Sequence, residues 1–417
     1  MNIISKKSLI ALLCVSAFAL TACGGKSGNN GSVESETSES TEVDYSELVD
    51  FTVEVETGRD IRVLQLTDPQ LMDYTQKREE DNVSSMYAPD KVEDFCYRYI
   101  RQTVERYDPD LIILTGDIIY GRFDDNGSLL KSYVEFMETL DTPWAPVFGN
   151  HDNESRMGVD WQCQQFVEAE NCLFKQRTLT GNGNYTVGLV QGDELKRVFF
   201  MLDSNGVASM SSETAANGHT KREVGFGQDQ IDWYIDAAQA IKRQSPNTKL
   251  SFAFHIQIAA FEYAFNTYTD YNALLNGVES AKVNLDDNAA AVAAGDFGYI
   301  GTSVRGAWDY PYTIYDSFLE LGVDSVFVGH EHSNSASINV GGIRLQFGQK
   351  SSQYDSFNKV INGGIVENNK VIGGKIIGGD VHEGIPLVGG TKITVLEKDG
   401  TIGGDTGLLL WEENWGK

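Results

Sequence analysis

The segment Leu111–Gly121, LIILTGDIIYG, places a carboxylate in the middle of an apolar run. Its first four residues are all apolar and predict a buried strand, and the chain is apolar again from Ile118. Asp117 lies between these two parts. Because an unpaired buried charge is costly, we expect a positive partner beside Asp117.

Four other apolar runs also end in residue types that bind metals. Four of the six histidines in the chain lie at such ends. In α/β folds the carboxyl ends of strands are where ligand sites collect, so these side chains are expected to converge with Asp117. Each one alone has a structural explanation, such as a helix cap or a buried histidine, but together they favour a functional site. The runs are IRVLQLTD, ending at Asp68; APVFGNHD, ending in Asn150, His151 and Asp152; LSFAFH, ending at His255; and DSVFVGHEH, ending in His330 and His332.

From about residue 50 the chain alternates strand-like runs with helical stretches, which predicts an α/β fold. Several of the runs are apolar throughout, so both faces of the predicted sheets should be covered. The helical stretches lie near residues 89–107, 128–140, 228–243 and 312–321, and Gly322 is a plausible stop for the last one.

The composition is that of a soluble globular protein. The 417 residues are 41% hydrophobic and 22% charged. The formal net charge is −27, from 33 basic and 60 acidic side chains, which disfavours nucleic-acid binding. A small anionic substrate would need local positive charge, such as metal ions.

The N-terminal part is expected to lie outside the fold. Residues 1–22 have two lysines, an apolar stretch and then small residues, as in a secretory signal peptide. Leu20–Cys23, LTAC, resembles a bacterial lipobox, which implies that Cys23 is lipidated. Residues 23–49 are rich in Gly, Ser and Glu and predict a flexible tether to a domain at 50–417. We therefore expect an exported cell-surface or periplasmic lipoprotein whose membrane contact is the anchor at Cys23.

Three cysteines remain in the predicted domain, at positions 96, 163 and 172. Cys163 and Cys172 are close enough in sequence for a disulfide in an exported protein, and two buried free thiols are an equal alternative.

A series of short motifs along the chain resembles those of calcineurin-like metallophosphoesterases. In order, they are Asp68, Gly116-Asp117, Gly149-Asn150-His151-Asp152, His255 and Gly329-His330-Glu331-His332. The match runs from about Arg62 to Gly348. The resemblance implies a four-layer α/β/β/α sandwich with two mixed sheets and two metal ions at the strand ends. It also implies that Asp117 bridges both ions, that Asp68 and His332 bind the first, and that Asn150, His255 and His330 bind the second.

The resemblance gives His151 a different role from the metal ligands. It implies that His151 faces the substrate and that Asp152 orients it. His151 would then stabilise developing charge or protonate the leaving oxygen. The burial of Asp117 is explained in the same way, since two close cations repel each other and need a shared carboxylate between them.

The first motif departs from the family pattern. It reads Asp68-Pro69-Gln70, where the family has a histidine ligand in place of Gln70. The second motif, Gly116–Tyr120, resembles the GDxxY of purple acid phosphatases, in which the tyrosine binds a ferric ion. Tyr120 is thus either the missing ligand or a core aromatic, and a phenolate would favour Fe(III) over Zn or Mn.

Four other polar residues are weaker candidates. A surface position is the better explanation for His219 and His382, and an equally good one for Arg122. Asp203 is more consistent with support of the fold.

These observations predict a phosphoesterase with a binuclear centre of Fe, Zn or Mn that hydrolyses small phosphate monoesters with water. A phosphodiesterase acting on nucleotides or lipid headgroups is the enzymatic alternative. A surface-binding lipoprotein that keeps the fold without turnover is the alternative from another class.

Overall fold

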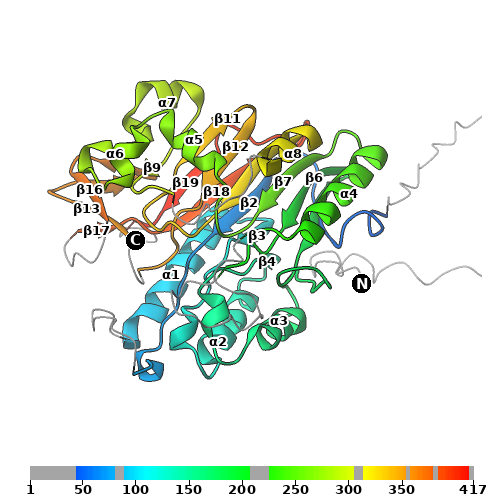
Figure 1. The fold of residues 1–417 in the computed structure, drawn as a ribbon, viewed down its shortest axis with the longest axis horizontal. Coiled ribbons are helices and arrows are strands. Elements are labelled where there is room, and N and C mark those ends of the chain that lie inside the picture. Colours follow the sequence, from blue (N-terminus) through cyan, green and yellow to red (C-terminus); the bar gives the residue numbers. More distant parts are fainter. Residues whose placement is uncertain are drawn as a thin grey trace, which may run out of the picture.

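The computed structural model describes residues 44–79, 89–206, 225–304, 313–353, 357–378 and 384–412. Within them two large mixed sheets pack against each other, and helices cover the outer face of each (Figure 1). The predicted α/β/β/α sandwich is therefore confirmed. The proposed signal peptide, the Cys23 anchor, residues 24–43 of the tether, His219 and His382 lie outside the described residues.

The five-stranded sheet carries the first half of the predicted site. Strands β2, β3 and β4 are parallel to one another, whereas β18 pairs antiparallel with both β2 and β19. The parallel strands bring their carboxyl ends to one edge, where the loops after them can meet. In spatial order the strands are β19 (Gly407–Leu410), β18 (Gly389–Val395), β2 (Ile61–Leu66), β3 (Leu111–Leu114) and β4 (Trp144–Pro146).

The seven-stranded sheet carries the second half. Strands β6, β7, β10 and β12 are parallel to one another, and antiparallel neighbours flank them on both sides. In spatial order the strands are β1 (Phe51–Val55), β5 (Tyr185–Gln191), β6 (Glu194–Met201), β7 (Lys249–Ala253), β10 (Val323–Val328), β12 (Ile343–Phe347) and β11 (Ser337–Val340).

The helices form the two outer layers. Three pack on the five-stranded sheet: α1 (Pro89–Tyr107), α2 (Ser128–Glu138) and α3 (Val159–Glu168). Those packed on the other sheet are α4 (Gln228–Gln244), α5 (Ala260–Asn266), α6 (Tyr271–Leu275), α7 (Ala289–Ala294) and α8 (Thr313–Leu321). The remaining described strands form small ribbons: β8 (Val283–Asn284) with β9 (Tyr299–Ile300), β14 (Ile365–Glu367) with β15 (Lys370–Ile372), and β13 (Asn358–Ile361) between β16 (Lys375–Gly378) and β17 (Ile385–Pro386).

The seven-stranded sheet has a hydrophobic core on each face, and alternate side chains of β6 point into the two cores. Phe199 and Met201 belong to the core between the sheets, whereas Val198 and Phe200 face the helices of the other core. A strand whose two faces are both covered must be apolar on both, as the run VFFM at residues 198–201 is.

The packed fold begins earlier than the predicted boundary at residue 50. Val49 is buried in the core under α4, and the Tyr45 hydroxyl donates to the carbonyl oxygen of Asp193. The tether prediction is therefore wrong for residues 45–49, because their apolar side chains pack on the second sheet.

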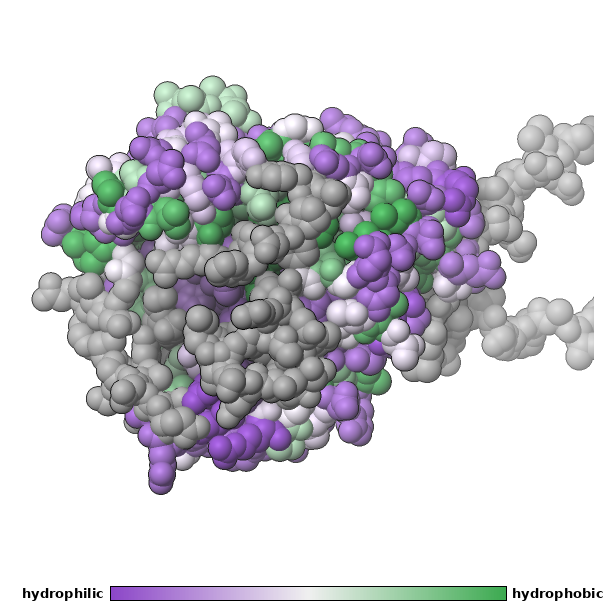
Figure 2. Space-filling view, in the orientation of Figure 1, coloured by the Kyte–Doolittle hydropathy of each residue, from purple (hydrophilic) through white to green (hydrophobic). Residues whose placement is uncertain are grey.

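The surface agrees with the acidic composition. In Figure 2 hydrophilic side chains cover much of the described face, and hydrophobic residues form separate patches. None of the helices in the described part of the chain has the length and apolar content needed to cross a bilayer.

Candidate metal centre and active site

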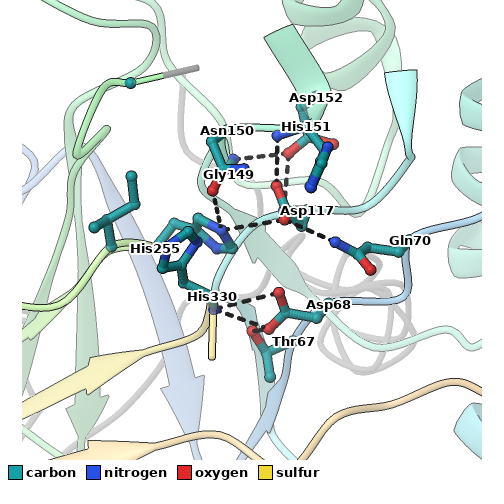
Figure 3. Close-up of polar contacts among 12 residues, drawn as sticks. Thr67, Asp68, Gln70, Asp117, Gly149, Asn150, His151, Asp152, His255 and His330 are labelled. Atoms are coloured by element: carbon teal, nitrogen blue, oxygen red, sulfur yellow. Dashed lines mark hydrogen bonds and ion pairs between the residues drawn. The ribbon is translucent and has the colours of Figure 1, made fainter. Parts of the chain in front are cut away.

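The predicted site residues converge where the ends of the two sheets meet (Figure 3). Asp68, Asp117 and Asn150 follow β2, β3 and β4, which are neighbours in the first sheet. His255 and His330 follow β7 and β10, which are neighbours in the second. The strand order thus brings together residues that are up to 262 positions apart, as the hydrogen bond from the His330 N–H to the Asp68 carboxylate shows.

Three of these residues adopt a backbone conformation that L-residues rarely adopt. The φ angles are +50° at Asp68, +51° at Asp117 and +75° at His330. Such left-handed residues cost free energy and cluster at functional sites, where the surrounding structure holds them. Here each one turns the chain sharply after a strand.

Two motif glycines are needed for this close approach. A Cβ atom on Gly149 would lie 2.2 Å from Oδ1 of Asp117, and one on Gly329 would lie 2.2 Å from Oγ1 of Thr67. Neither neighbour can withdraw without moving the loop that carries it. Gly149 therefore makes room for the neighbouring loop after β3 in its own sheet, and Gly329 for a loop of the opposite sheet.

The residues predicted for the first metal form a compact cluster. Ligand atoms of Asp68, Asp117 and His332 all lie within 4.8 Å of one another. His332 Nε2 is 3.4 Å from Asp68 Oδ1, and the Thr67 hydroxyl donates to Asp68 Oδ2 at 2.7 Å. Two buried carboxylates and an imidazole suit a hard divalent or trivalent ion, so this donor set fits the implied metal.

The residues predicted for the second metal lie on the other side of Asp117. His255 Nε2 is 3.0 Å from Asn150 Oδ1 and 3.3 Å from Asp117 Oδ2. His255 Nδ1 donates to the Thr115 carbonyl at 2.8 Å, which turns Nε2 toward the cluster. The His330 ring completes the group, 5.2 Å from the His255 ring between centroids. An amide oxygen and two imidazoles are donor types that bind such ions.

The electrostatics of the cluster reflect an excess of buried negative charge. Burial alone would lower the pKa of His255, but the carboxylates of Asp117 and Asp68 raise it to about 9. Burial would raise the pKa of Asp117, but positive His255 and His151 hold it far below its usual value. Burial and the charge on His255 lower the pKa of His330 to about 3, so its ring is neutral, as a metal ligand requires.

His151 is joined to this cluster through its backbone. Its N–H donates to Asp117 Oδ1 at 2.8 Å, while its ring Nδ1 lies 2.9 Å from Glu154 Oε2. The Tyr120 ring packs on the imidazole with a centroid distance of 3.9 Å. The ring of His151 is thus fixed by a carboxylate and an aromatic side chain.

Asp152 does not have the orienting role predicted for it. Its carboxylate accepts backbone N–H groups of Asp117 at 2.9 Å, Ile119 at 3.0 Å and Gly149 at 2.7 Å. Burial and the Asp117 carboxylate raise the pKa of Asp152 to about 7. The correction is that Asp152 ties the two metal loops together, while Glu154 holds His151.

Sequence reasoning missed Glu154 and Lys350. Glu154 ends the short 3-10 helix Asp152–Glu154, whose turn brings it back to His151 three positions earlier. Lys350 follows β12 beneath the first motif and is only 1% exposed. Its Nζ donates to Gln70 Oε1 at 3.3 Å. The spacing of Glu154 was a signal that could have been read, whereas nothing local marks Lys350.

Two other expectations concern support of the fold. Asp203 accepts backbone N–H groups of Asn182 and Asn205, which is the supporting role expected of it. Cys163 and Cys172 are both buried free thiols, so the alternative without a disulfide is the one found.

Comparison with known proteins agrees with this geometry. The family model described as calcineurin-like phosphoesterase matches residues 61–334. The chain belongs to this family. Its members use a binuclear metal centre, and the cluster of Asp68, Asp117 and His332 is a group of side chains that could hold a metal ion.

Individual relatives of this chain are distant. Probable inactive purple acid phosphatase 29 of Arabidopsis thaliana is 23% identical over 60% of the chain. Phosphatase DCR2 of Saccharomyces cerevisiae is 22% identical over 57% of the chain. The chain spans 61% and 38% of the lengths of these two relatives.

Solved structures also resemble this chain. The purple acid phosphatase PPD1 from yellow lupin seeds has a TM-score of 0.35 at 12% identity, covering 83% of this chain and 53% of that one. A dimetal phosphatase from Danio rerio has a TM-score of 0.38 at 11% identity, covering 77% of this chain and 96% of that one.

Proposed function

We propose that this calcineurin-like phosphoesterase hydrolyses phosphate monoesters at a binuclear metal centre around Asp117. The observation that carries the proposal is the position of the Asp117 carboxylate. One of its oxygens lies within 4.8 Å of ligand atoms of both Asp68 and His332, and its Oδ2 is 3.3 Å from His255 Nε2.

The ligand assignment follows this division. The first ion would be held by Asp68, His332 and Tyr120. The second would be held by Asn150, His255 and His330, and Asp117 would bind both ions. When bound, the two ions would activate water and stabilise charge on the phosphoryl oxygens. We propose Fe, Zn or Mn as the metals, with Fe(III) at the first position if Tyr120 is a ligand.

The protein's own contribution to proton transfer centres on His151. Glu154 engages Nδ1 at 2.9 Å, so the other ring nitrogen, Nε2, is the one that would meet the substrate. From there it would stabilise the developing charge or give a proton to the leaving oxygen. A positioned acid of this kind contributes roughly 10²–10⁴-fold to rate.

The GDxxY motif supports a monoester substrate over a diester, because it is shared with purple acid phosphatases. A non-catalytic binding protein is the second candidate. Two observations favour it: Gln70 stands at a ligand position, and the Arabidopsis relative is named a probable inactive purple acid phosphatase. Retention of His151 with its carboxylate partner argues against it, since a metal scaffold needs neither.

We further propose that the protein acts outside the cytoplasm, anchored by lipid at Cys23. The support is the sequence of residues 1–23 alone. Labelling with a radioactive fatty acid should mark the wild type and not Cys23→Ala.

The test of the function is hydrolysis by purified protein of a panel of phosphate monoesters and diesters, with and without added Fe, Zn or Mn. We expect metal-dependent turnover that is fastest on monoesters. Two bound ions without turnover on any substrate would favour the binding protein, and turnover fastest on diesters would favour the phosphodiesterase.

A further inference from the structure

Gln70 occupies the position where the family pattern has a metal-binding histidine, and its side chain is held between two charged groups. It is fully buried, and its Nε2 donates to Asp117 Oδ2 at 3.0 Å. Its Oε1 accepts from Lys350 Nζ at 3.3 Å. Figure 3 shows the amide directed at the bridging carboxylate.

The two partners fix which end of the amide faces the cluster. An ammonium group can only donate, so it requires the amide oxygen, and a carboxylate can only accept, so it requires the amide nitrogen. The end that faces Asp117 is therefore an NH₂ group, which has no lone pair to give to a metal. Gln70 in this orientation is not a ligand.

Lys350 is itself firmly placed. Its Nζ also donates to the Asp68 carbonyl oxygen at 2.9 Å, and it is 1% exposed. The next residue, Ser351, binds the Thr67 carbonyl oxygen through its hydroxyl at 2.6 Å and through its N–H at 3.0 Å. The loop after β12 thus clamps the turn that carries Asp68, and this clamp holds a buried positive charge beside the first metal position.

We propose that Lys350 and Gln70 form a positioning pair: Lys350 locks the Gln70 amide so that it orients Asp117 and stays off the first metal ion. The buried charge of Lys350 also weakens binding at that position, since like charges repel strongly at low dielectric. The first ion then depends on Asp68, Asp117, His332 and Tyr120. This inference rests on the proposed function only in taking the cluster as a metal site.

The first test measures metal binding directly. Chelated protein is titrated with Mn²⁺ by calorimetry, and the affinity of each ion is compared between wild type, Gln70→Met and Lys350→Met. We expect Gln70→Met to keep both ions, because no ligand is lost. The dissociation constant of its weaker Mn²⁺ site should stay within about threefold of the wild-type value. Lys350→Met should tighten the weaker site by about fivefold or more, because it removes a cation and releases the amide oxygen.

A matched control is Lys359→Met, which removes another largely buried lysine whose ammonium lies 4.5 Å from the Phe357 ring centroid. It should leave both Mn²⁺ affinities unchanged. Loss of one Mn²⁺ in Gln70→Met would show that Gln70 is a ligand, and an unchanged affinity in Lys350→Met would remove the electrostatic role. Either result would overturn the proposal.

The second test needs no metal. A double-mutant cycle of the same two substitutions, followed by thermal unfolding of chelated protein, should be non-additive, because each single variant already removes the contact between Lys350 Nζ and Gln70 Oε1. Additive changes in thermal stability would contradict the proposed pairing of Lys350 with Gln70. A wild type that binds no Mn²⁺ would refute the proposed function, while the cycle would still decide whether Lys350 and Gln70 act as a pair.

Discussion

Oε2 of Glu154 lies 2.9 Å from Nδ1 of His151, the histidine that the GNHD motif places beside the metal cluster. This contact sets the tautomer and the direction of the ring, because the nitrogen that faces a carboxylate carries the proton. His151 therefore depends on a residue outside the motif.

Substitutions at this pair should separate catalysis from metal binding. His151→Ala should lower kcat by roughly 10²–10⁴-fold, and Glu154→Gln by less, because the amide can still engage Nδ1. Metal content, measured by mass spectrometry of the purified proteins, should stay near that of the wild type. Loss of metal in His151→Ala, or an unchanged rate, would contradict its assigned role.

Asp152 should behave as a structural residue. Asp152→Asn places an NH₂ group against at least one backbone N–H that the carboxylate now accepts, and we expect the free energy of unfolding to fall by about 1–3 kcal/mol. Urea unfolding of metal-free protein would measure this. A variant with wild-type stability and a catalytic defect would instead restore the catalytic role predicted from the motif.

Tyr120 offers a spectroscopic test. The GDxxY spacing predicts a phenolate ligand to iron, and charge transfer from phenolate to Fe(III) would colour the protein. We expect a visible absorption band in iron-loaded wild type that disappears in Tyr120→Phe, which keeps the ring packed on His151. Colourless iron-loaded wild type would leave Tyr120 with its packing role alone.

The Asp50 carboxylate should make stability depend on pH. Burial by itself raises the pKa of Asp50, but Lys175 at 2.5 Å and Arg177 at 2.7 Å outweigh it, so the pKa lies below its usual value. A carboxyl group whose pKa is lowered by folding stabilises the fold at pH values above its pKa in the unfolded chain, about 3.9. This contribution is lost as the pH falls through the pKa in the folded protein.

Asp50→Asn should therefore be destabilised by about 1–3 kcal/mol near neutral pH, with a smaller difference near about pH 3. Urea unfolding at both pH values measures it, with Glu320→Gln on the exposed face of α8 as the control. A difference that does not shrink in acid would contradict the assignment.

The sequence predicted an α/β fold with covered sheets because these features depend on local pattern, whereas the four layers were implied by the family resemblance. Each ligand directly follows an apolar strand, and parallel strands bring such positions together. Lys350 could not be predicted, because its role arises only when the loop after β12 packs beneath the loop after β2. Asp152 was misassigned because its side chain turns to backbone groups that no sequence pattern reveals.

Other differences have equally physical causes. Residues 45–49 resemble a tether in composition, yet Val49 is buried. The short helices and ribbon between Ala260 and Ile300 lack a clear period, so they were not predicted. The cysteine pair was left open, since spacing alone does not decide whether two thiols meet.

The central claim is that Asp117 bridges two metal ions used for phosphoester hydrolysis. The most direct measurement is the metal content of purified wild type and Asp117→Asn, taken together with the rate of phosphate monoester hydrolysis before and after chelation. The account predicts two ions per wild-type chain, hydrolysis abolished by chelation and restored by added metal, and loss of both ions and of activity in Asp117→Asn. An Asp117→Asn protein with full metal content and the wild-type rate would contradict it.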